Sequence, residues 1–156
     1  GYAKSQYNLA CCYSNGQGVE KDEKTAFAWY QKAASHGDVN AQYSLGVCYE
    51  NALGTEVDYY RAIAWYEKAA EEGDAMAQYN LGCLYRAGEG IETDEKLAFK
   101  YFEQSAKAGY APGMYNLGMC YEHGVGTEGD IDAAMEWYVK AADNGDELAA
   151  EKLKRS

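Results

Sequence analysis

Residues Gly73 to Ala108 read GDAMAQYNLGCLYRAGEGIETDEKLAFKYFEQSAKA, and the rest of the chain repeats this stretch. A shift of 36 residues aligns it, without gaps, with the stretches that begin at Gly1, Gly37 and Gly109. One aligned column holds the leucines Leu9, Leu45, Leu81, Leu117 and Leu153. A fixed period of this length is typical of a stacked repeat array, in which each unit buries its apolar face only against its neighbours.

Each unit has the pattern of two helices joined by a glycine-containing loop. In the first unit, Ser5, Leu9 and Tyr13 lie four residues apart and form one stripe of a helix. Gly16 fits the left-handed position after that helix, and Asp22 stands where a side chain can cap the next one. The predicted helices span residues 3 to 15, 22 to 36, 39 to 51, 58 to 72, 75 to 87, 94 to 108, 111 to 123, 130 to 144 and 146 to 155.

Ala52 and Lys154 are two of the departures from this pattern. Ala52 replaces the first loop glycine of its unit, and a left-handed backbone costs alanine more than glycine. We therefore expect either that Asn51 takes the left-handed conformation or that the turn shifts by one residue. Lys154 stands where earlier units have Ala10 or glycine, so the last helix is predicted to be a terminal cap that faces water.

A family motif recurs in register, and the second unit carries it as Ala41, Leu45-Gly46, Tyr49, Gly54, Asp58, Ala62, Trp65-Tyr66, Lys68-Ala69-Ala70 and Gly73. This motif resembles the Sel1-like repeat, a relative of the tetratricopeptide repeat with a longer loop. The resemblance covers the whole chain. It implies an all-α, right-handed superhelical α-solenoid of four helix-turn-helix repeats (1–36, 37–72, 73–108 and 109–144) plus a C-terminal capping helix in a half repeat (145–156). Because the chain opens at a repeat boundary and not with methionine, we expect it to be a fragment of a longer protein.

The formal charge is −11, and part of it recurs with the repeat. One loop column is always glutamate, and the column two residues later is always aspartate. Stacked units would align these carboxylates into an acidic ridge of Glu20, Asp22, Glu56, Asp58, Glu92, Asp94, Glu128 and Asp130. The ridge argues against nucleic acid as a partner, because phosphates need a basic face. We interpret it as solvated surface with helix caps, and a docking site for a basic partner is the alternative.

The side of the first helices that faces away from the leucine stripe carries tyrosines and amides. If first helices line the inside of the superhelix, as the resemblance implies, these columns form a groove for an extended or helical peptide. Tyrosine offers a large contact area, and asparagine can hydrogen-bond a peptide backbone. The candidate residues are Tyr7, Asn8, Tyr43, Ser44, Val47, Tyr79, Asn80, Cys83, Tyr115, Asn116 and Met119. Alternatively, the tyrosine column packs between adjacent first helices, whereas packing explains the asparagine column less easily.

The resemblance implies an adaptor, because Sel1-like proteins generally hold other proteins and are not in general enzymes. We predict a monomeric scaffold that binds a peptide or protein segment in its concave groove. The first alternative is a structural spacer between domains of a longer protein. The second, a hydrolase of the kind suggested for cysteine-rich relatives, is disfavoured because the chain lacks a nucleophile motif.

Other signals are weak, and we expect no cofactor, no metal and no membrane insertion. Gly124 to Gly129 matches G-x-G-x-x-G, but no strand precedes it, and Glu128 would face a phosphate. His36 and His123 have no cysteine or histidine at metal-ligand spacing. No apolar run approaches the roughly 18 residues of a membrane-spanning helix.

All five cysteines lie in first helices. Equivalent positions on packed helices are about 8 to 10 Å apart, beyond the Cα separation of roughly 7 Å that a disulfide tolerates. We therefore predict that Cys12, Cys48 and Cys120 are buried thiols and that Cys11 and Cys83 are reachable from solvent. Unpaired cysteines favour a reducing, cytoplasmic compartment.

One aromatic column invites two interpretations. It holds Trp29, Trp65, Tyr101 and Trp137, which could form an aromatic ligand box or pack in the core. The alanines at helical spacing around each ring favour core packing.

Overall fold

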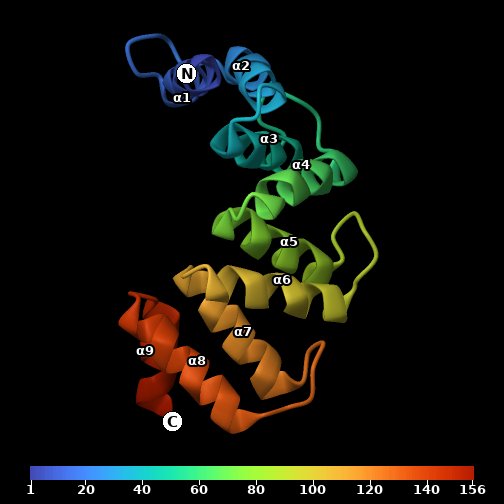
Figure 1. Ribbon diagram of the computed structural model, residues 1–156, viewed down its shortest axis with the longest axis vertical. Helices are drawn as coiled ribbons and strands as arrows, with labels where there is room; N and C mark the ends of the chain where they lie inside the picture. Colours follow the sequence, from blue (N-terminus) through green and yellow to red (C-terminus); the bar gives the residue numbers. More distant parts are fainter. The chain divides into compact units, whose positions relative to one another are not determined.

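The computed structural model describes residues 1–156, which form nine helices and no strand (Figure 1). In chain order the helices are α1 (Tyr2–Asn15), α2 (Glu23–Ser35), α3 (Val39–Asn51), α4 (Tyr59–Glu71), α5 (Ala75–Ala87), α6 (Glu95–Lys107), α7 (Ala111–His123), α8 (Ile131–Asp143) and α9 (Glu147–Arg155). Every bound lies within one residue of its predicted position. The all-α class and the order of four helix pairs plus one are confirmed.

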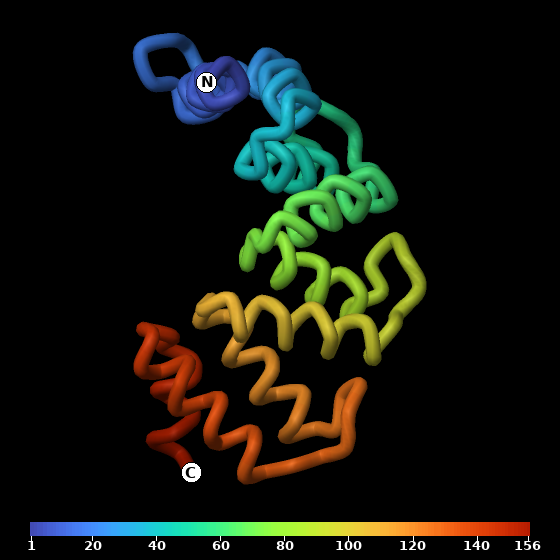
Figure 2. The backbone as a smooth tube through the Cα atoms, in the orientation of Figure 1, coloured from blue at the N-terminus to red at the C-terminus, as the bar shows by residue number.

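Two compact units divide the chain, Gly1–Glu72 with α1 to α4 and Gly73–Ser156 with α5 to α9. Within each unit the chain turns back on itself after every first helix, as the tube in Figure 2 shows. First helices pack on the second helix of their own repeat, and α2, α6 and α8 also contact the first helix that follows them. Leu45, Leu81 and Leu117 of the leucine column are fully buried in these contacts.

Aspartates begin most of the helices. In seven cases the carboxylate before the helix accepts a hydrogen bond from the backbone N–H three residues later, at 2.8 to 3.1 Å. Such a cap satisfies one of the amide groups that a helix start leaves without an intrahelical partner. Helix α7 has no side-chain cap of this kind, and Pro112 lies in its first turn instead.

Glycines in the first helices let the second helix of the same repeat approach closely. A Cβ atom at Gly46 would lie 2.6 Å from the ring of Tyr66, and one at Gly118 would lie 2.7 Å from the ring of Tyr138. Only a residue without a side chain leaves room for these buried rings. Lys154 of α9 lies in the same column and is exposed, as predicted for the last helix.

The second loop glycine joins a repeat to the one before it. Gly54 has a φ of 73°, and a Cβ atom there would lie 2.2 Å from the carbonyl oxygen of Glu23 on α2. Gly126 makes the same approach to Glu95 on α6. A side chain at either position would push the loop off the preceding second helix. The apparent nucleotide-binding motif around Gly126 is thus explained by repeat stacking.

Ala52 corrects one expectation. Ala52 itself takes the left-handed conformation, with a φ of 57°, and is the one residue other than glycine with a positive φ. Asn51 stays in the helix and donates its side-chain amide to the carbonyl of Val47 at 3.1 Å. The turn has the same length as in the other units, because Gly54 must still reach the preceding helix.

The tryptophan column packs at the edge of the core, and Trp137 lies against the core of the second unit, as expected. Each indole is half-buried, and a lysine ammonium lies 4.3 to 4.4 Å from the ring centroid in the pairs Trp29–Lys32, Trp65–Lys68 and Trp137–Lys140. Cation–π attraction of this kind suits a ring with one face in solvent. The buried rings belong to the next column, Tyr30, Tyr66, Phe102 and Tyr138.

Two departures from the repeat compensate each other where α6 meets α7. Ser105 replaces an alanine, is fully buried and donates its hydroxyl to the carbonyl of Ala75 at 2.7 Å. Gly113 also replaces an alanine, and a Cβ atom there would lie 2.4 Å from the Ser105 hydroxyl oxygen. The equivalent pair between α2 and α3 is Ala33 and Ala41, both fully buried. The hydroxyl on one helix occupies the space of the methyl group missing from the other.

This compensation can be measured with a double-mutant cycle. We expect Gly113→Ala to lower the free energy of unfolding by about 1 to 3 kcal/mol, because it overpacks the site. Ser105→Ala removes one hydrogen bond and should cost about 1 kcal/mol. The double variant restores the alanine pair, so its loss should fall short of the sum by about 1 kcal/mol. Urea unfolding followed by circular dichroism gives the four values, and additive losses would show that the two departures are unrelated.

The strain at Ala52 gives a second prediction. Ala52→Gly should raise the free energy of unfolding by up to about 1 kcal/mol, because relief of the left-handed strain exceeds the added chain entropy of glycine. The matched control is Gly124→Ala, at the equivalent turn with a φ of 67°, which should destabilise the protein. Thermal unfolding of both variants measures the effect, and a loss of stability in Ala52→Gly would contradict it.

Candidate functional site

The eleven predicted peptide-binding residues come from α1 and α3 in the first unit and from α5 and α7 in the second. Asn8 is exposed, and the other ten are half-buried. All of them therefore keep part of their surface in solvent. Each unit presents its own portion of the candidate surface.

Each tyrosine of the candidate column packs against the buried ring of its own repeat. Ring centroids lie 5.6 to 6.0 Å apart in the pairs Tyr7–Tyr30, Tyr43–Tyr66, Tyr79–Phe102 and Tyr115–Tyr138. Tyr79 also meets Tyr110 edge-on at 5.4 Å. The tyrosine column therefore does pack within the protein, mainly against the second helix of the same repeat. Each of these tyrosines still keeps part of its surface in solvent.

Two tyrosines of the candidate column, Tyr7 and Tyr79, have raised pKa values. Burial raises the pKa of Tyr7 to about 12, although the neighbouring Ser44 side chain partly offsets the rise. Burial likewise raises the pKa of Tyr79. These hydroxyls are therefore uncharged hydrogen-bonding groups at physiological pH.

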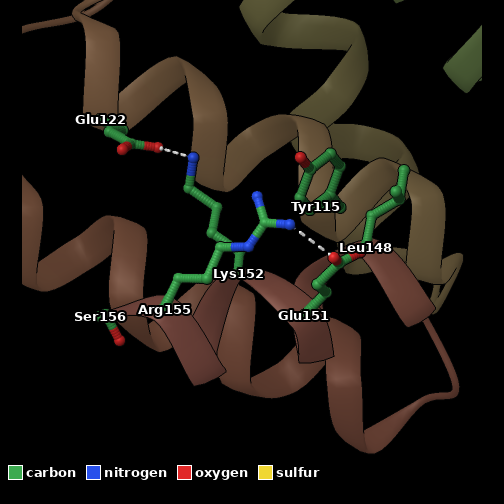
Figure 3. A pocket seen from close by; sticks show the side chains of 7 residues that line it. All are labelled: Tyr115, Glu122, Leu148, Glu151, Lys152, Arg155 and Ser156. Atoms are coloured by element: carbon green, nitrogen blue, oxygen red, sulfur yellow. Dashed lines mark hydrogen bonds and ion pairs between the residues drawn. The ribbon is translucent and has the colours of Figure 1, made fainter.

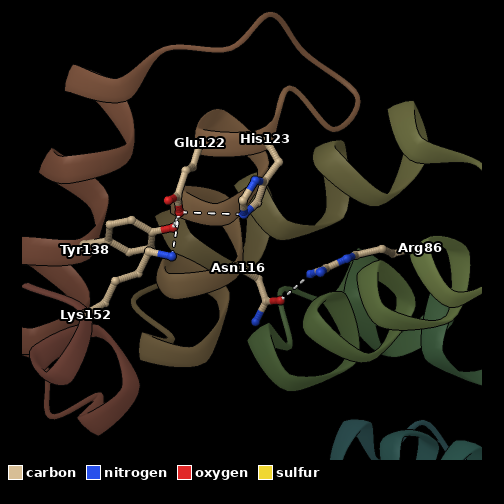
Figure 4. A network of polar contacts seen from close by, with 6 residues as sticks. All are labelled: Arg86, Asn116, Glu122, His123, Tyr138 and Lys152. Carbon is tan, nitrogen blue, oxygen red and sulfur yellow. Dashed lines mark hydrogen bonds and ion pairs between the residues drawn. The ribbon is translucent and has the colours of Figure 1, made fainter. Parts of the chain in front are cut away.

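Asn116 hydrogen-bonds to other residues of the protein. For this asparagine, the expectation that packing explains the column less easily is corrected. Arg86 of α5 donates to the Asn116 side-chain oxygen at 3.1 Å, and Asn116 donates to the carbonyl of Pro112 at 2.9 Å (Figure 4). Tyr79 is a further hydrogen-bonding neighbour of Asn116. This amide joins two repeats, and its orientation is set before any ligand arrives.

Carboxylates accept hydrogen bonds from two of the buried tyrosines. Tyr66 donates to Glu50, and Tyr138 donates to Glu122, both at 2.5 Å. Lys152 of α9 lies 2.7 Å from the same Glu122 oxygen, as Figure 4 shows. The hydrogen bonds from Lys152 and Tyr138 hold the pKa of Glu122 below its ordinary value. Helices α7, α8 and α9 meet at this carboxylate.

The third repeat has no glutamate in the column of Glu50 and Glu122, and its buried ring has no hydroxyl to donate. In the third repeat the buried ring is Phe102, and the column holds Arg86 in place of glutamate. Sequence reasoning missed this column because its residues differ between repeats. The simultaneous loss of the hydroxyl and of its acceptor is the signal that could have revealed it.

Two hollows lie beside candidate residues. One, of about 420 Å³, lies between α7 and α9 and includes Tyr115, Glu122, Lys152 and Arg155 (Figure 3). Its charges are paired, because Lys152 contacts Glu122 and Arg155 contacts Glu151 at 2.7 Å.

The other hollow, of about 190 Å³, lies where α1 and α2 meet α3. Three candidates, Tyr43, Ser44 and Val47, come together in its wall. Sequence reasoning placed these three residues on one face but gave no sign of a hollow between them.

The acidic ridge divides into two kinds of carboxylate. Asp22, Asp58, Asp94 and Asp130 each cap a second helix, which confirms the predicted cap role. The hydrogen bond from the Thr25 hydroxyl, followed by the capping bond from its backbone N–H, lowers the pKa of Asp22. Glu20, Glu56, Glu92 and Glu128 are exposed. Whether the glutamates dock a partner stays a prediction.

No disulfide joins the five cysteines. Cys48 and Cys120 are buried as predicted, and burial raises their pKa to about 12 and about 11. Cys12 is half-buried, so the prediction is wrong there. Cys11 and Cys83 are half-buried.

The structure also bears on metal binding and on membrane spanning. No set of three or more His, Cys, Asp or Glu side chains is grouped as a metal site would need. None of the helices combines the length and apolarity required to cross a bilayer.

Comparison with known proteins identifies the repeat. A family model described as Sel1 repeat matches residues 3–38, 39–74, 75–110 and 111–146. The chain belongs to the Sel1 repeat family. Sel1 repeat proteins are generally protein-interaction scaffolds and are typically non-catalytic. No curated relative matched the chain.

Solved structures agree with this assignment. A Sel1 repeat protein from Oxalobacter formigenes is 33% identical with a TM-score of 0.88, over 94% of this chain and 60% of that one. A protective antigen of uropathogenic Escherichia coli with an SLR fold is 38% identical with a TM-score of 0.93, over 97% of this chain and 32% of that one. Cysteine rich protein B of Helicobacter pylori shares the fold at 24% identity and a TM-score of 0.67, over 87% of this chain and 98% of that one. The chain thus spans less than two thirds of the first two relatives.

The Glu122 contacts predict a pH-dependent stability in this Sel1 repeat protein. Glu122→Gln should unfold at a lower temperature than the parent at pH 7, with a difference that shrinks as the pH falls toward 3. A carboxylate with a lowered pKa in the folded state stabilises the fold above its unfolded-state pKa and loses this effect when it is protonated. Calorimetry at several pH values measures the difference.

Glu151→Gln is the matched control. It removes the exposed pair with Arg155, which should be worth no more than about 0.5 kcal/mol. A Glu122→Gln difference that stays constant from pH 7 to pH 3 would show that charge plays no part at this site.

Proposed function

We propose that this chain is a scaffold that binds an extended or helical peptide segment along the tyrosine-bearing faces of its first helices. The observation that carries the proposal is that four tyrosines are each fixed against a buried ring and yet keep part of their surface in solvent. Binding then requires little ordering of the side chains, which favours affinity.

Neighbouring polar groups support the same surface. Ser44 and Asn116 are neutral hydrogen-bonding residues beside the tyrosines, and each lies near a tyrosine of the preceding repeat. Both side chains can hydrogen-bond a peptide backbone, and neither requires the peptide to carry a charge. The net charge of −11 would attract a ligand with basic residues.

Binding is tested with peptides selected from a random display library and measured by calorimetry. The variant Asn80→Ala with Asn116→Ala should weaken binding tenfold or more. Because Asn116 has protein partners, we expect this variant also to lose about 1 kcal/mol of stability. The matched variant Glu56→Lys with Glu92→Lys changes two exposed ridge residues that cap no helix, and it should bind within about threefold of the parent.

The opposite pattern would refute the groove. If the asparagine variant binds normally and the ridge variant does not, the acidic ridge is the docking surface. If no peptide is enriched over a resin control, the structural-spacer interpretation is favoured instead.

A further inference from the structure

The hollow between α1, α2 and α3 differs from the same place in the second unit. Ser14, Ser44 and Val47 line it in the first unit. A shift of two repeats places Arg86, Asn116 and Met119 at these positions. All three are larger, and Arg86 reaches across to Asn116. The hollow is therefore a property of the first unit's side chains and not of the repeat fold.

The interior of this hollow is mainly apolar. Ala26 and Cys48 are buried in its wall, and the rings of Tyr30 and Tyr43 flank it. The Cys48 thiol stays protonated, because burial raises its pKa to about 12. The volume of the hollow, about 190 Å³, exceeds the ~150 Å³ of a cavity that holds benzene. One aromatic side chain would fit, and aromatic walls favour a ring.

Glu23 is the one charged side chain that lines the hollow, and no lysine or arginine lies in its wall. Lys21 lies 3.8 Å from Glu23, but both side chains are well exposed, so this ion pair is weak and can rearrange. A cationic group next to the bound ring would therefore be favoured over an anionic one.

We propose that this hollow is the anchor pocket for one aromatic side chain of the bound peptide, with a neighbouring lysine or arginine of the peptide directed at Glu23. The proposal rests on the proposed function, since it assigns a specificity pocket within the same peptide-binding surface.

The first test uses the probe 2-phenylethylammonium, which carries a ring and a cation, and observes methyl signals by nuclear magnetic resonance. We expect saturable shifts at Val47 and Ala26 with a dissociation constant on the order of 1 mM, as suits so small a ligand. The anion 3-phenylpropanoate should bind at least threefold more weakly, and Glu23→Gln should remove this preference. An absence of shifts at Val47 in the parent would overturn the proposal.

The second test exchanges the residues of the two units. Ser14→Arg with Ser44→Asn and Val47→Met fills the hollow with side chains that the fold already accepts at α5 and α7, and it should weaken probe binding tenfold or more. The reciprocal variant, Arg86→Ser with Asn116→Ser and Met119→Val, should create a second probe site, seen as new shifts of the methyl signals of Ala98 and Val125. Should the filled variant fail to fold by circular dichroism, the reciprocal variant decides the question. Unchanged binding in the filled variant, or no new site in the reciprocal one, would overturn the pocket assignment.

Peptide selection separates this inference from the proposed function. Selected peptides with an aromatic residue next to a basic one, which lose binding in the filled variant, support both. Peptides that bind the parent and the filled variant equally leave the proposed function standing and overturn the anchor pocket. If no peptide is enriched while 2-phenylethylammonium still shifts Val47, the peptide scaffold and the peptide anchor are both refuted, and the hollow is a small-molecule site.

Discussion

The close approach of the two helices within a repeat is the constraint on which the other contacts depend. Gly46 and Gly118 leave room for the rings of Tyr66 and Tyr138, which a single methyl group would displace. With the ring in this position, its hydroxyl reaches a carboxylate on the first helix, at Glu50 or Glu122. The half-buried tyrosine of the candidate surface then rests on the same ring. Core packing and the geometry of the candidate surface therefore share one contact.

Differences between the repeats come in compensating sets. Ser105 and Gly113 depart from alanine together because their atoms occupy the same space. Phe102 lacks a hydroxyl, and Arg86 in the facing column turns to Asn116 instead. In both sets the partner residue lies on a neighbouring helix.

The fold was predictable from sequence because its determinants are local and periodic. Each helix begins and ends within a few residues of the features that determine its bounds, which are the aspartate caps, the loop glycines and the leucine stripe. The failures concern contacts between repeats. Ala52 accepts a left-handed backbone because Gly54 must dock on α2, and Asn116 is held by Arg86 from the preceding repeat. The hollow escaped notice because it requires several small side chains on different helices at once, although comparing residue sizes column by column would have indicated it.

The columns of the repeat differ in how much they vary from one repeat to the next. Columns that hold the helices together change little, as the buried leucines and the paired rings show. The columns that change most in size, represented by Ser14 and Arg86 or by Val47 and Met119, face the candidate surface. The Val47 column lies beside the candidate surface, whereas the Ser14 column also includes Glu50 and Glu122, which accept hydrogen bonds from buried tyrosines of the second helices. Because the two units differ at these columns, they offer different chemistry on the same backbone, and a family with one fold can acquire many partners in this way.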